Sequence, residues 1–240
     1  MTEKKTTKGT IKVQSFGPYL VEGDIPLVHK TQIVSEYGEP LNWKTDEVLK
    51  TEGPYELCRC GHSHEKPFCD STHCECDFDG MEKAPTDNFV DRQRVNDSGT
   101  GIVVKSDFTL CMDSGFCGNR LVNIKKMIAD TAEPKVRAEI MAMIDRCPSG
   151  TYSYAMDKDS EDIEADYPVQ IAVTTEITSE GPIEGSLWAT GYIPVERSDG
   201  KPFETRNRVT LCNCGESKKK PLCDGTHRHD QEEALKKAKA

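Results

Sequence analysis

The sequence predicts an α+β fold in which two small β-rich units flank a segment that contains two helices. Three observations predict this fold. The two ends of the chain repeat one another, glycine and proline divide these ends into short strands, and apolar residues in the middle recur with helical spacing. We therefore expect an N-terminal unit over residues 1–80, a middle segment over 81–160 and a C-terminal unit over 161–240.

The repeat aligns residues 17–27 with residues 185–195, and in both copies two glycines and an Ile-Pro step keep their spacing. Glycine and proline at these points end short strands. The strands expected are 11–14, 19–22, 170–174 and 187–190. A repeat of this kind uses one structural unit twice, and we expect the two copies to pack face to face about a pseudo-two-fold axis.

The middle segment is expected to be helical in two places. Val122, Ile124 and Met127 indicate a short helix. From Val136 to Ile144, apolar residues recur at intervals of three and four, and Pro134 stands near the first turn. We expect the methionine-rich face of this second helix to lie in the core.

The composition is that of an acidic, soluble protein. The chain has 240 residues, 30% of them charged, and a formal net charge of −10. An acidic surface repels nucleic acid, so we expect no nucleic-acid partner. No apolar run reaches the roughly 20 residues that span a membrane, and none opens the chain. The chain has 11 cysteines, and we expect a cytoplasmic protein in which the thiols clustered with histidine are metal ligands rather than disulfide partners.

Cysteine and histidine recur in two sets with identical spacing. The first set is Cys58, Cys60, Cys69 and His73, and the second is Cys212, Cys214, Cys223 and His227. Residues i and i+2 of a strand face the same side, so the first two sulfurs of each set can aim at one centre. The last cysteine and the histidine are four apart, which suits one helical turn.

Three thiolates and one imidazole are a complete set of ligands for two kinds of metal site. Tetrahedral zinc accepts three cysteines and one histidine, but its cysteine pairs usually have two to four residues between them. A pair with a single intervening residue suits a larger, two-iron centre in which two sulfurs hold one iron. The spacing alone favours iron and leaves zinc open.

The residues around both sets resemble those of the CDGSH iron-sulfur (mitoNEET-like) family, whose pattern is C-x-C-x2-[ST]-x3-P-x-C-D-G-[SAT]-H. The second set fits the pattern throughout, with Ser217, Pro221 and the run over residues 224–227. The resemblance implies that each set binds a 2Fe–2S cluster. The first two cysteines would hold one iron, and the third cysteine and the histidine would hold the other.

The first set departs from the family pattern at one position. Ser63 and Pro67 fit, but Ser71 stands where glycine is expected. If that position needs a positive φ, serine there costs about 1 kcal/mol. Cys74 and Cys76 follow this set directly, and we expect them to be spare cysteines.

Three further cysteines of the middle segment follow ferredoxin spacing. Cys111 and Cys117 are six apart, like the first and third cysteines of C-x2-C-x2-C, with Ser114 in the second slot and Cys147 farther along. The segment resembles a divergent single-cluster ferredoxin domain, whose members often carry histidine where this chain has Asp113. The resemblance implies a 3Fe–4S cluster, or a 4Fe–4S cluster with an oxygen ligand. The alternative is a ferredoxin-like fold whose thiols are merely buried.

These patterns predict an iron-sulfur protein with two 2Fe–2S clusters that acts in electron transfer or redox sensing. A carrier that donates 2Fe–2S clusters to apo-proteins is the alternative, and a zinc-stabilised interaction module is less favoured. No catalytic motif stands out, so we expect a non-enzyme that serves as redox subunit or partner of a reductase. The partner would be a redox protein or an apo-protein acceptor, with no membrane involved. We expect a monomer that contains an intramolecular pseudo-dimer.

Overall fold

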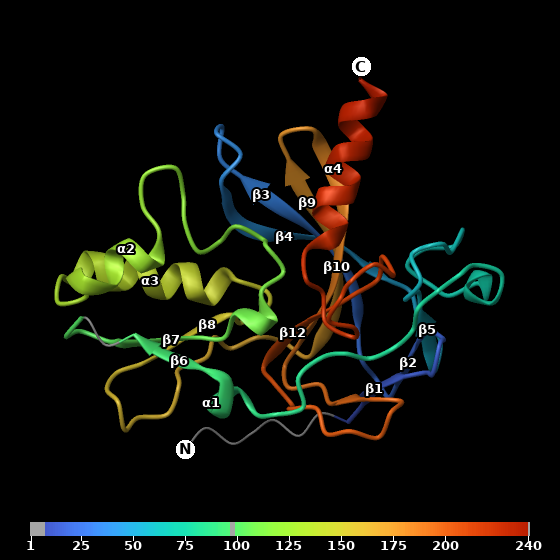
Figure 1. The fold of residues 1–240 in the computed structure, drawn as a ribbon, viewed down its shortest axis with the longest axis horizontal. Coiled ribbons are helices and arrows are strands. Elements are labelled where there is room, and N and C mark those ends of the chain that lie inside the picture. The colour runs from blue at the N-terminus through green and yellow to red at the C-terminus, as the bar shows by residue number, and fades with distance from the viewer. Residues whose placement is uncertain (1–7, 97–98, 240) are drawn as a thin grey trace.

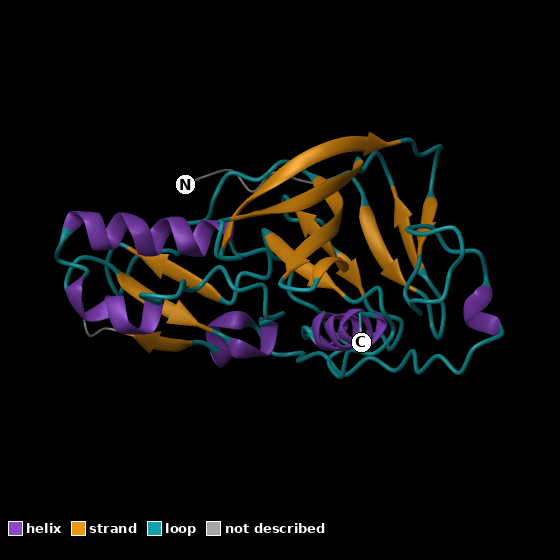
Figure 2. Cartoon of the chain, turned by 90° about the horizontal axis from the view of Figure 1, so that it is seen from above, coloured by secondary structure: helices purple, strands orange, loops and turns teal. Residues whose placement is uncertain are grey.

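The computed structural model describes residues 8–96 and 99–239 and confirms the α+β fold class. Two larger sheets build the β-rich body, and a third, smaller sheet belongs to the middle segment. Figure 1 shows the middle segment beside that body, with helix α4 (Thr226–Ala238) projecting from it. Seen from above, the helices of the middle segment stay on one side of the molecule (Figure 2).

The two larger sheets each contain strands from both ends of the chain. The first has the order β11-β1-β2-β5 and the second β12-β10-β9-β3-β4. The N-terminal strands are β1 (Thr10–Val13), β2 (Tyr19–Glu22), β3 (Leu27–Val34), β4 (Pro40–Leu49) and β5 (Tyr55–Leu57). The C-terminal strands are β9 (Gln170–Thr178), β10 (Gly181–Thr190), β11 (Val195–Glu196) and β12 (Arg208–Leu211). The repeated units therefore exchange strands.

The exchange is reciprocal and uses the Ile-Pro step of each copy. The Ile11 amide donates to the Pro194 carbonyl at 2.9 Å, and the Ile171 amide donates to the Pro26 carbonyl at 2.9 Å. From there β1 runs parallel to β11, and β9 runs parallel to β3. Proline has no N–H, so it fits just before a strand, where its carbonyl still accepts. The two copies are thus related by a pseudo-two-fold axis.

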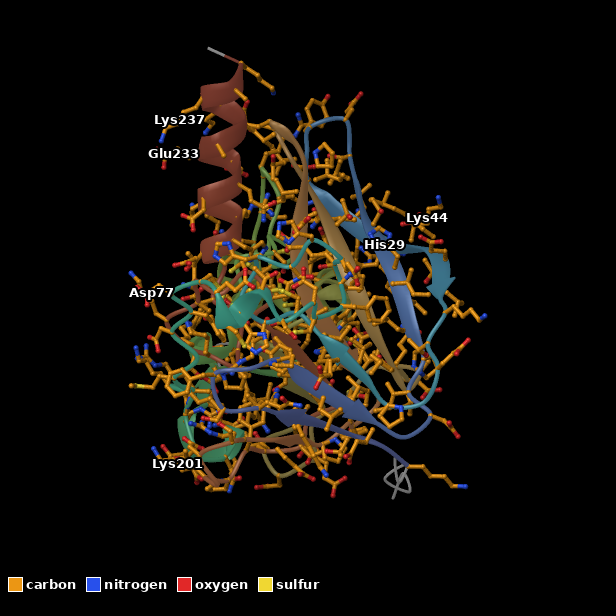
Figure 3. The ribbon with its side chains drawn as sticks, turned by 90° about the vertical axis from the view of Figure 1, so that its right-hand side faces the viewer. His29, Lys44, Asp77, Lys201, Glu233 and Lys237 are labelled. Carbon is orange, nitrogen blue, oxygen red and sulfur yellow. The ribbon has the colours of Figure 1, made fainter. Side chains whose placement is uncertain are left out.

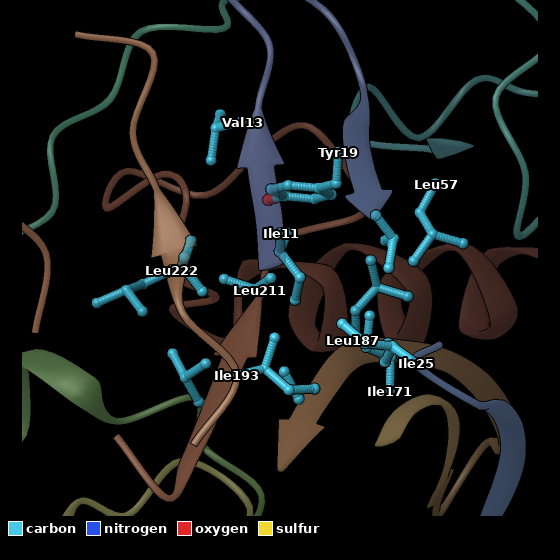
Figure 4. Close-up of a cluster of buried hydrophobic side chains, with 14 of the residues drawn as sticks. Ile11, Val13, Tyr19, Ile25, Leu57, Ile171, Leu187, Ile193, Leu211 and Leu222 are labelled. Carbon is cyan, nitrogen blue, oxygen red and sulfur yellow. The ribbon is translucent and has the colours of Figure 1, made fainter. Parts of the chain in front are cut away.

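One hydrophobic core serves both units. Figure 4 shows Ile11, Tyr19 and Leu57 of the N-terminal unit packed with Ile171 and Leu211 of the C-terminal unit. All five side chains are buried. Apolar burial of this kind contributes roughly 1.5–3 kcal/mol per large side chain. Because the core is shared, the two ends of the chain stabilise one another.

The middle segment contains the two predicted helices, α2 (Ile124–Met127) and α3 (Pro134–Arg146). Pro134 stands in the first turn of α3, and Ile140, Met143 and Ile144 are buried, as expected of its apolar face. The segment also has a three-stranded antiparallel sheet that the sequence analysis missed. Its strands are β6 (Arg94–Asn96), β7 (Val103–Ser106) and β8 (Tyr152–Ala155), preceded by the single-turn helix α1 (Phe89–Arg92).

The predicted strands at the chain ends exist, but two are longer than expected. β9 continues to Thr178, and β10 begins as early as Gly181. These extensions are rich in threonine and glutamate, which a hydropathy pattern does not mark as buried. In the structure Glu176 and Thr178 are buried nonetheless, which shows that β9 has an internal polar face.

Helix α4 begins at Thr226, inside the second ligand set, where the spacing of Cys223 and His227 suits a helical turn. Its outer face is charged, and Glu233 and Lys237 lie 2.7 Å apart, one turn from each other. Figure 3 shows both side chains pointing away from the body. Among the described residues, no helix combines the length and the hydropathy needed to cross a membrane.

Candidate metal centres

Strand β5 delivers the first ligand set. It ends at Leu57, so that Cys58 and Cys60 follow directly, with their sulfurs 3.8 Å apart. The chain then loops back to Cys69, whose sulfur lies 3.4 Å from Nδ1 of His73. The first set is therefore two close pairs of ligand atoms.

Strand β12 delivers the second ligand set in the same way. It ends at Leu211, and the sulfurs of Cys212 and Cys214 lie 3.6 Å apart. Cys223 and Nδ1 of His227 are separated by 3.3 Å. Both sets thus repeat one geometry as well as one spacing.

The separations within each pair fit two ligands on one metal ion. Thiolates about 2.3 Å from a tetrahedral metal lie about 3.8 Å apart, and a thiolate–imidazole pair lies slightly closer. Across the described part of the chain, no three Cys, His, Asp or Glu side chains converge on a single metal position. Each set is therefore two pairs of ligand atoms, and each pair has the separation of two ligands on one metal ion.

The same hydrogen bonds hold both ligand loops. The amide of Cys58 donates to the Pro67 carbonyl at 2.8 Å, and the amide of Cys212 donates to the Pro221 carbonyl at 2.8 Å. A serine hydroxyl bridges each loop from within. Ser63 donates to the Phe68 carbonyl at 2.7 Å, and Ser217 donates to the Leu222 carbonyl at 2.6 Å. The family serine and proline positions are therefore structural supports for the loop.

Asp70 and Asp224 close the loops. Asp70 accepts from the His64 amide at 2.8 Å and from the Thr72 amide at 3.0 Å, and Asp224 accepts from the equivalent amides of Lys218 and Thr226. Each carboxylate thus reaches the first amide of the following helical turn. After the first set this turn is only a 3₁₀ turn, Thr72–Cys74, whereas after the second it continues into α4.

The position after each aspartate has a left-handed backbone. Gly225 has φ 88°, and Ser71 has φ 71°. The sequence analysis made the cost of Ser71 conditional on a positive φ, and the structure meets that condition. Serine at this position is therefore strained by about 1 kcal/mol relative to glycine.

The two ligand loops pack against each other through Gly61 and Gly215. A Cβ atom on Gly61 would overlap the carbonyl of Cys214, and one on Gly215 would overlap the carbonyl of Cys60. Both glycines have φ 84°. Each glycine thus lets its loop approach a ligand residue of the other set across the pseudo-two-fold axis.

The histidines of the two sets have different surroundings. The outer nitrogen of His227, Nε2, lies 2.9 Å from Oε1 of Glu176, and the other carboxylate oxygen accepts from Arg228 at 3.0 Å. Glu176 and His227 are buried. Sequence reasoning missed Glu176, because a lone glutamate in a polar strand carries no motif.

The two sets also differ in exposure. Cys69 and His73 are half-buried, whereas Cys223 and His227 are buried. Burial raises the pKa of both the Cys69 and the Cys223 thiols. A metal that binds them must therefore displace their protons, which couples metal binding to proton release.

The three cysteines of the middle segment line one pocket. Cys111, Cys117 and Cys147 surround it together with Asp113 and Ser114. Burial raises the pKa of the Cys111 and Cys117 thiols, and the neighbouring Cys147 raises both further. The fold therefore brings these three thiols together, as the ferredoxin spacing predicts.

The middle loop lies directly against the second ligand set. A Cβ atom on Gly225 would come within 2.8 Å of the Met112 carbonyl oxygen. Met112 is buried, and its sulfur accepts from the Ser186 hydroxyl at 3.5 Å. Gln32 of β3 donates to the Ser114 carbonyl of the same loop at 3.3 Å. The middle pocket and the C-terminal set are therefore neighbours.

Two cysteines expected to be spare lie at the first set. Cys74 is exposed, while Cys76 lies beside Cys60. The pKa of the Cys60 thiol is raised, mainly by burial and additionally by Cys76. Cys76 therefore adds a fourth thiol to those of Cys58, Cys60 and Cys69 at the N-terminal site.

Comparisons with known families agree with this geometry. Residues 16–74 and 184–228 match the family described as iron-binding zinc finger, CDGSH type. Residues 98–157 match the divergent 4Fe-4S mono-cluster family. Neither the curated proteins nor the solved structures yielded a match.

Proposed function

Because the chain carries two CDGSH-type iron-binding segments flanking a divergent 4Fe-4S mono-cluster domain, we propose that it is a three-cluster iron-sulfur protein of electron transfer or redox sensing. Each CDGSH set would hold one 2Fe–2S cluster. In the first, Cys58 and Cys60 would bind one iron, and Cys69 and His73 the other. The second set would divide in the same way.

The pairing of the ligand atoms supports iron clusters over zinc. The four pairs have separations between 3.3 and 3.8 Å, and no four ligands converge on one point among the described residues. A zinc site needs all four ligands around one ion. A zinc-stabilised interaction module is therefore the least supported function.

The middle pocket supports a third cluster. Cys111, Cys117 and Cys147 supply three thiolates, and Asp113 lines the same pocket with a carboxylate. We propose a 4Fe–4S cluster there, with oxygen completing the ligand set, in keeping with the matched family. A 3Fe–4S cluster on the three cysteines alone is the alternative.

The observation that carries electron transfer is the contact between the three sites. The middle loop touches the C-terminal set at Gly225, and that set touches the N-terminal set through Gly61 and Gly215. Bound clusters supply one-electron chemistry, with potentials that respond to ligand type and surroundings. A continuous row of three such sites suits electron passage through the chain.

Iron and acid-labile sulfide per chain test the proposal, together with EPR of the anaerobically reduced protein. About four irons would indicate the paired sites alone, and about eight would include a 4Fe–4S cluster in the middle. We expect about eight, with magnetic coupling between neighbouring signals. A protein purified without oxygen that contains zinc and no iron would refute the proposal.

Cluster donation is the second candidate, and the exposure of the N-terminal site favours it. Cys69 and His73 are half-buried, so an acceptor protein could reach this edge of the site. Transfer to an apo-ferredoxin without release of free iron would support donation. Retention of all clusters through repeated reduction cycles would support electron transfer.

We further propose a cytoplasmic monomer that is not itself an enzyme and works with a redox partner or an apo-protein acceptor. The shared core and the exchanged strands support the monomer, because one chain already supplies both halves of the pseudo-dimer. Size-exclusion chromatography with light scattering tests it.

A further inference from the structure

The C-terminal histidine is held at both ring nitrogens. Nδ1 of His227 lies 3.3 Å from the Cys223 sulfur, and Nε2 lies 2.9 Å from Oε1 of Glu176. With Nε2–H donating to the carboxylate, the lone pair of Nδ1 faces the ligand site. A carboxylate in this position fixes the tautomer and ring orientation of a metal-binding histidine, and it raises the basicity of the ligand.

Glu176 is placed for this contact by charge as well as by distance. It is fully buried, and its Oε2 accepts from Nη1 of Arg228 at 3.0 Å. Arg228 follows His227 on α4 and also lies 3.5 Å from Glu232. A buried carboxylate without such a partner would be costly, so the contact with Arg228 offsets the burial of Glu176.

The long β9–β10 hairpin is what brings Glu176 to the site. β9 and β10 have 9 and 10 residues, whereas their counterparts β1 and β2 have 4 each. Ile11 and Ile171 hold equivalent positions, because each donates to the Ile-Pro carbonyl of the other copy. Five residues beyond Ile171 is Glu176, whereas five residues beyond Ile11 is Phe16, an exposed residue in the turn after β1.

The N-terminal histidine therefore has no counterpart of this contact. Nδ1 of His73 faces Cys69, but within the described residues no hydrogen bond reaches its Nε2. His73 and Cys69 are also half-buried, in contrast to the buried Cys223 and His227. The two sets match in their ligands and differ in what holds the histidine.

We propose that Glu176 is a positioning residue for His227, and that it makes the C-terminal site retentive and leaves the N-terminal site as the one that releases its cluster. This inference rests on the proposed function, because it requires a cluster at each CDGSH set. Loss of an outer hydrogen bond to a metal-binding histidine typically weakens metal affinity about 10- to 100-fold.

The test follows cluster loss to an iron chelator at one neutral pH in the full-length loaded protein. His73→Cys and His227→Cys variants first assign the two 2Fe–2S EPR signals to their sites. We expect the wild-type N-terminal signal to decay faster than the C-terminal one. Glu176→Gln, which keeps a hydrogen-bond acceptor but removes the charge, should speed decay of the C-terminal signal about 10-fold or more. Glu176→Ala should speed it further.

Glu180→Gln is the matched control. Glu180 lies at the tip of the same hairpin and also bonds a cation, Lys239 directly after α4, at 3.2 Å, but it touches no ligand. The Glu180→Gln variant should leave the decay rates of both EPR signals unchanged. A merely structural role of Glu176 would not raise the reduction potential of the C-terminal cluster alone. Removal of a negative charge beside that cluster should do so in Glu176→Gln.

Equal decay of both signals in the wild type would overturn the inference, as would a Glu176→Gln variant that behaves like Glu180→Gln. In either case the protein would still hold its clusters, so the proposed function would stand. A chain that binds no iron would refute the proposed function, and the inference with it.

Discussion

The contact between the two ligand loops makes a quantitative prediction for Gly215→Ala. Gly215 has φ 84°, and an added Cβ would overlap the carbonyl of Cys60. That carbonyl belongs to the backbone of the opposite ligand loop, so it cannot rotate away as a flexible side chain would. The substitution therefore forces the two loops apart.

Two costs add at this position, and a control separates them. An alanine in the left-handed region costs about 1–2 kcal/mol. Overpacking against a fixed neighbour adds about 1–3 kcal/mol. Gly200→Ala has only the first cost, because Gly200 has φ 68° and nothing within 4 Å of an added Cβ. The difference between the two variants should be about 1–3 kcal/mol.

Thermal unfolding of the loaded protein measures this difference. For a chain of this length, 1 kcal/mol shifts Tm by about 2–4 °C, so Gly215→Ala should melt about 2–12 °C below Gly200→Ala. Gly61→Ala should behave like Gly215→Ala, because the contact is reciprocal. The double variant should cost less than the sum, since the first substitution already separates the loops. Equal melting of Gly215→Ala and Gly200→Ala would refute the packing of loop on loop.

Three further predictions follow from single positions. Ser71→Gly should raise the unfolding free energy by up to about 1 kcal/mol, because it removes the strain of a serine at φ 71°; urea unfolding measures it. Asp199→Asn should destabilise the protein near neutral pH by less than about 1 kcal/mol, because Asp199 pairs with Arg197 at 2.6 Å. That pairing lowers the pKa of Asp199 to about 2, so its contribution is present above the unfolded pKa near 4 and fades as the pH falls towards 2; urea midpoints should converge with the wild type over that range. His227→Cys should lower the reduction potential of the C-terminal cluster, because it replaces a neutral imidazole with a thiolate. An EPR-monitored redox titration measures this potential, and an unchanged value would contradict the prediction.

The closeness of the cysteine and histidine side chains within each set could be predicted because it depends on local sequence. Spacing and residue type alone bring Cys58 beside Cys60 and Cys69 beside His73, and the structure places each pair within 3.8 Å. The condition on Ser71 was also local, since a backbone angle depends on one residue and its turn. These predictions needed no knowledge of distant contacts.

The exchange of strands between the two units could not be predicted from the local sequence. An Ile-Pro step indicates that a strand begins after the proline, but it does not say which strand will be its neighbour. The pairing of β1 with β11 and of β9 with β3 depends on how the two copies pack around a shared core. Sequence similarity between the copies indicated the symmetry and left the topology open.

Glu176 was missed for a related reason. Glu176 lies beyond the predicted strand 170–174, in a run of threonine and glutamate that a hydropathy pattern does not mark as buried. Only the tertiary fold shows that this glutamate is buried against a histidine 51 positions later. The small sheet of the middle segment was missed as well, since its three strands have at most 4 residues each.

The position of the C-terminal set gives a reason for a histidine whose ring is held in place by Glu176. That set contacts both neighbours, the middle loop at Gly225 and the N-terminal loop at Gly215, so it is the central site of the three. Loss of a cluster at the centre would divide the row, whereas loss at the half-buried N-terminal end would leave the other two sites in contact. A central histidine held by Glu176 and an outer one that is not are therefore compatible with both proposed activities. Electrons would pass through the central cluster, while exchange with a partner would be confined to the N-terminal end.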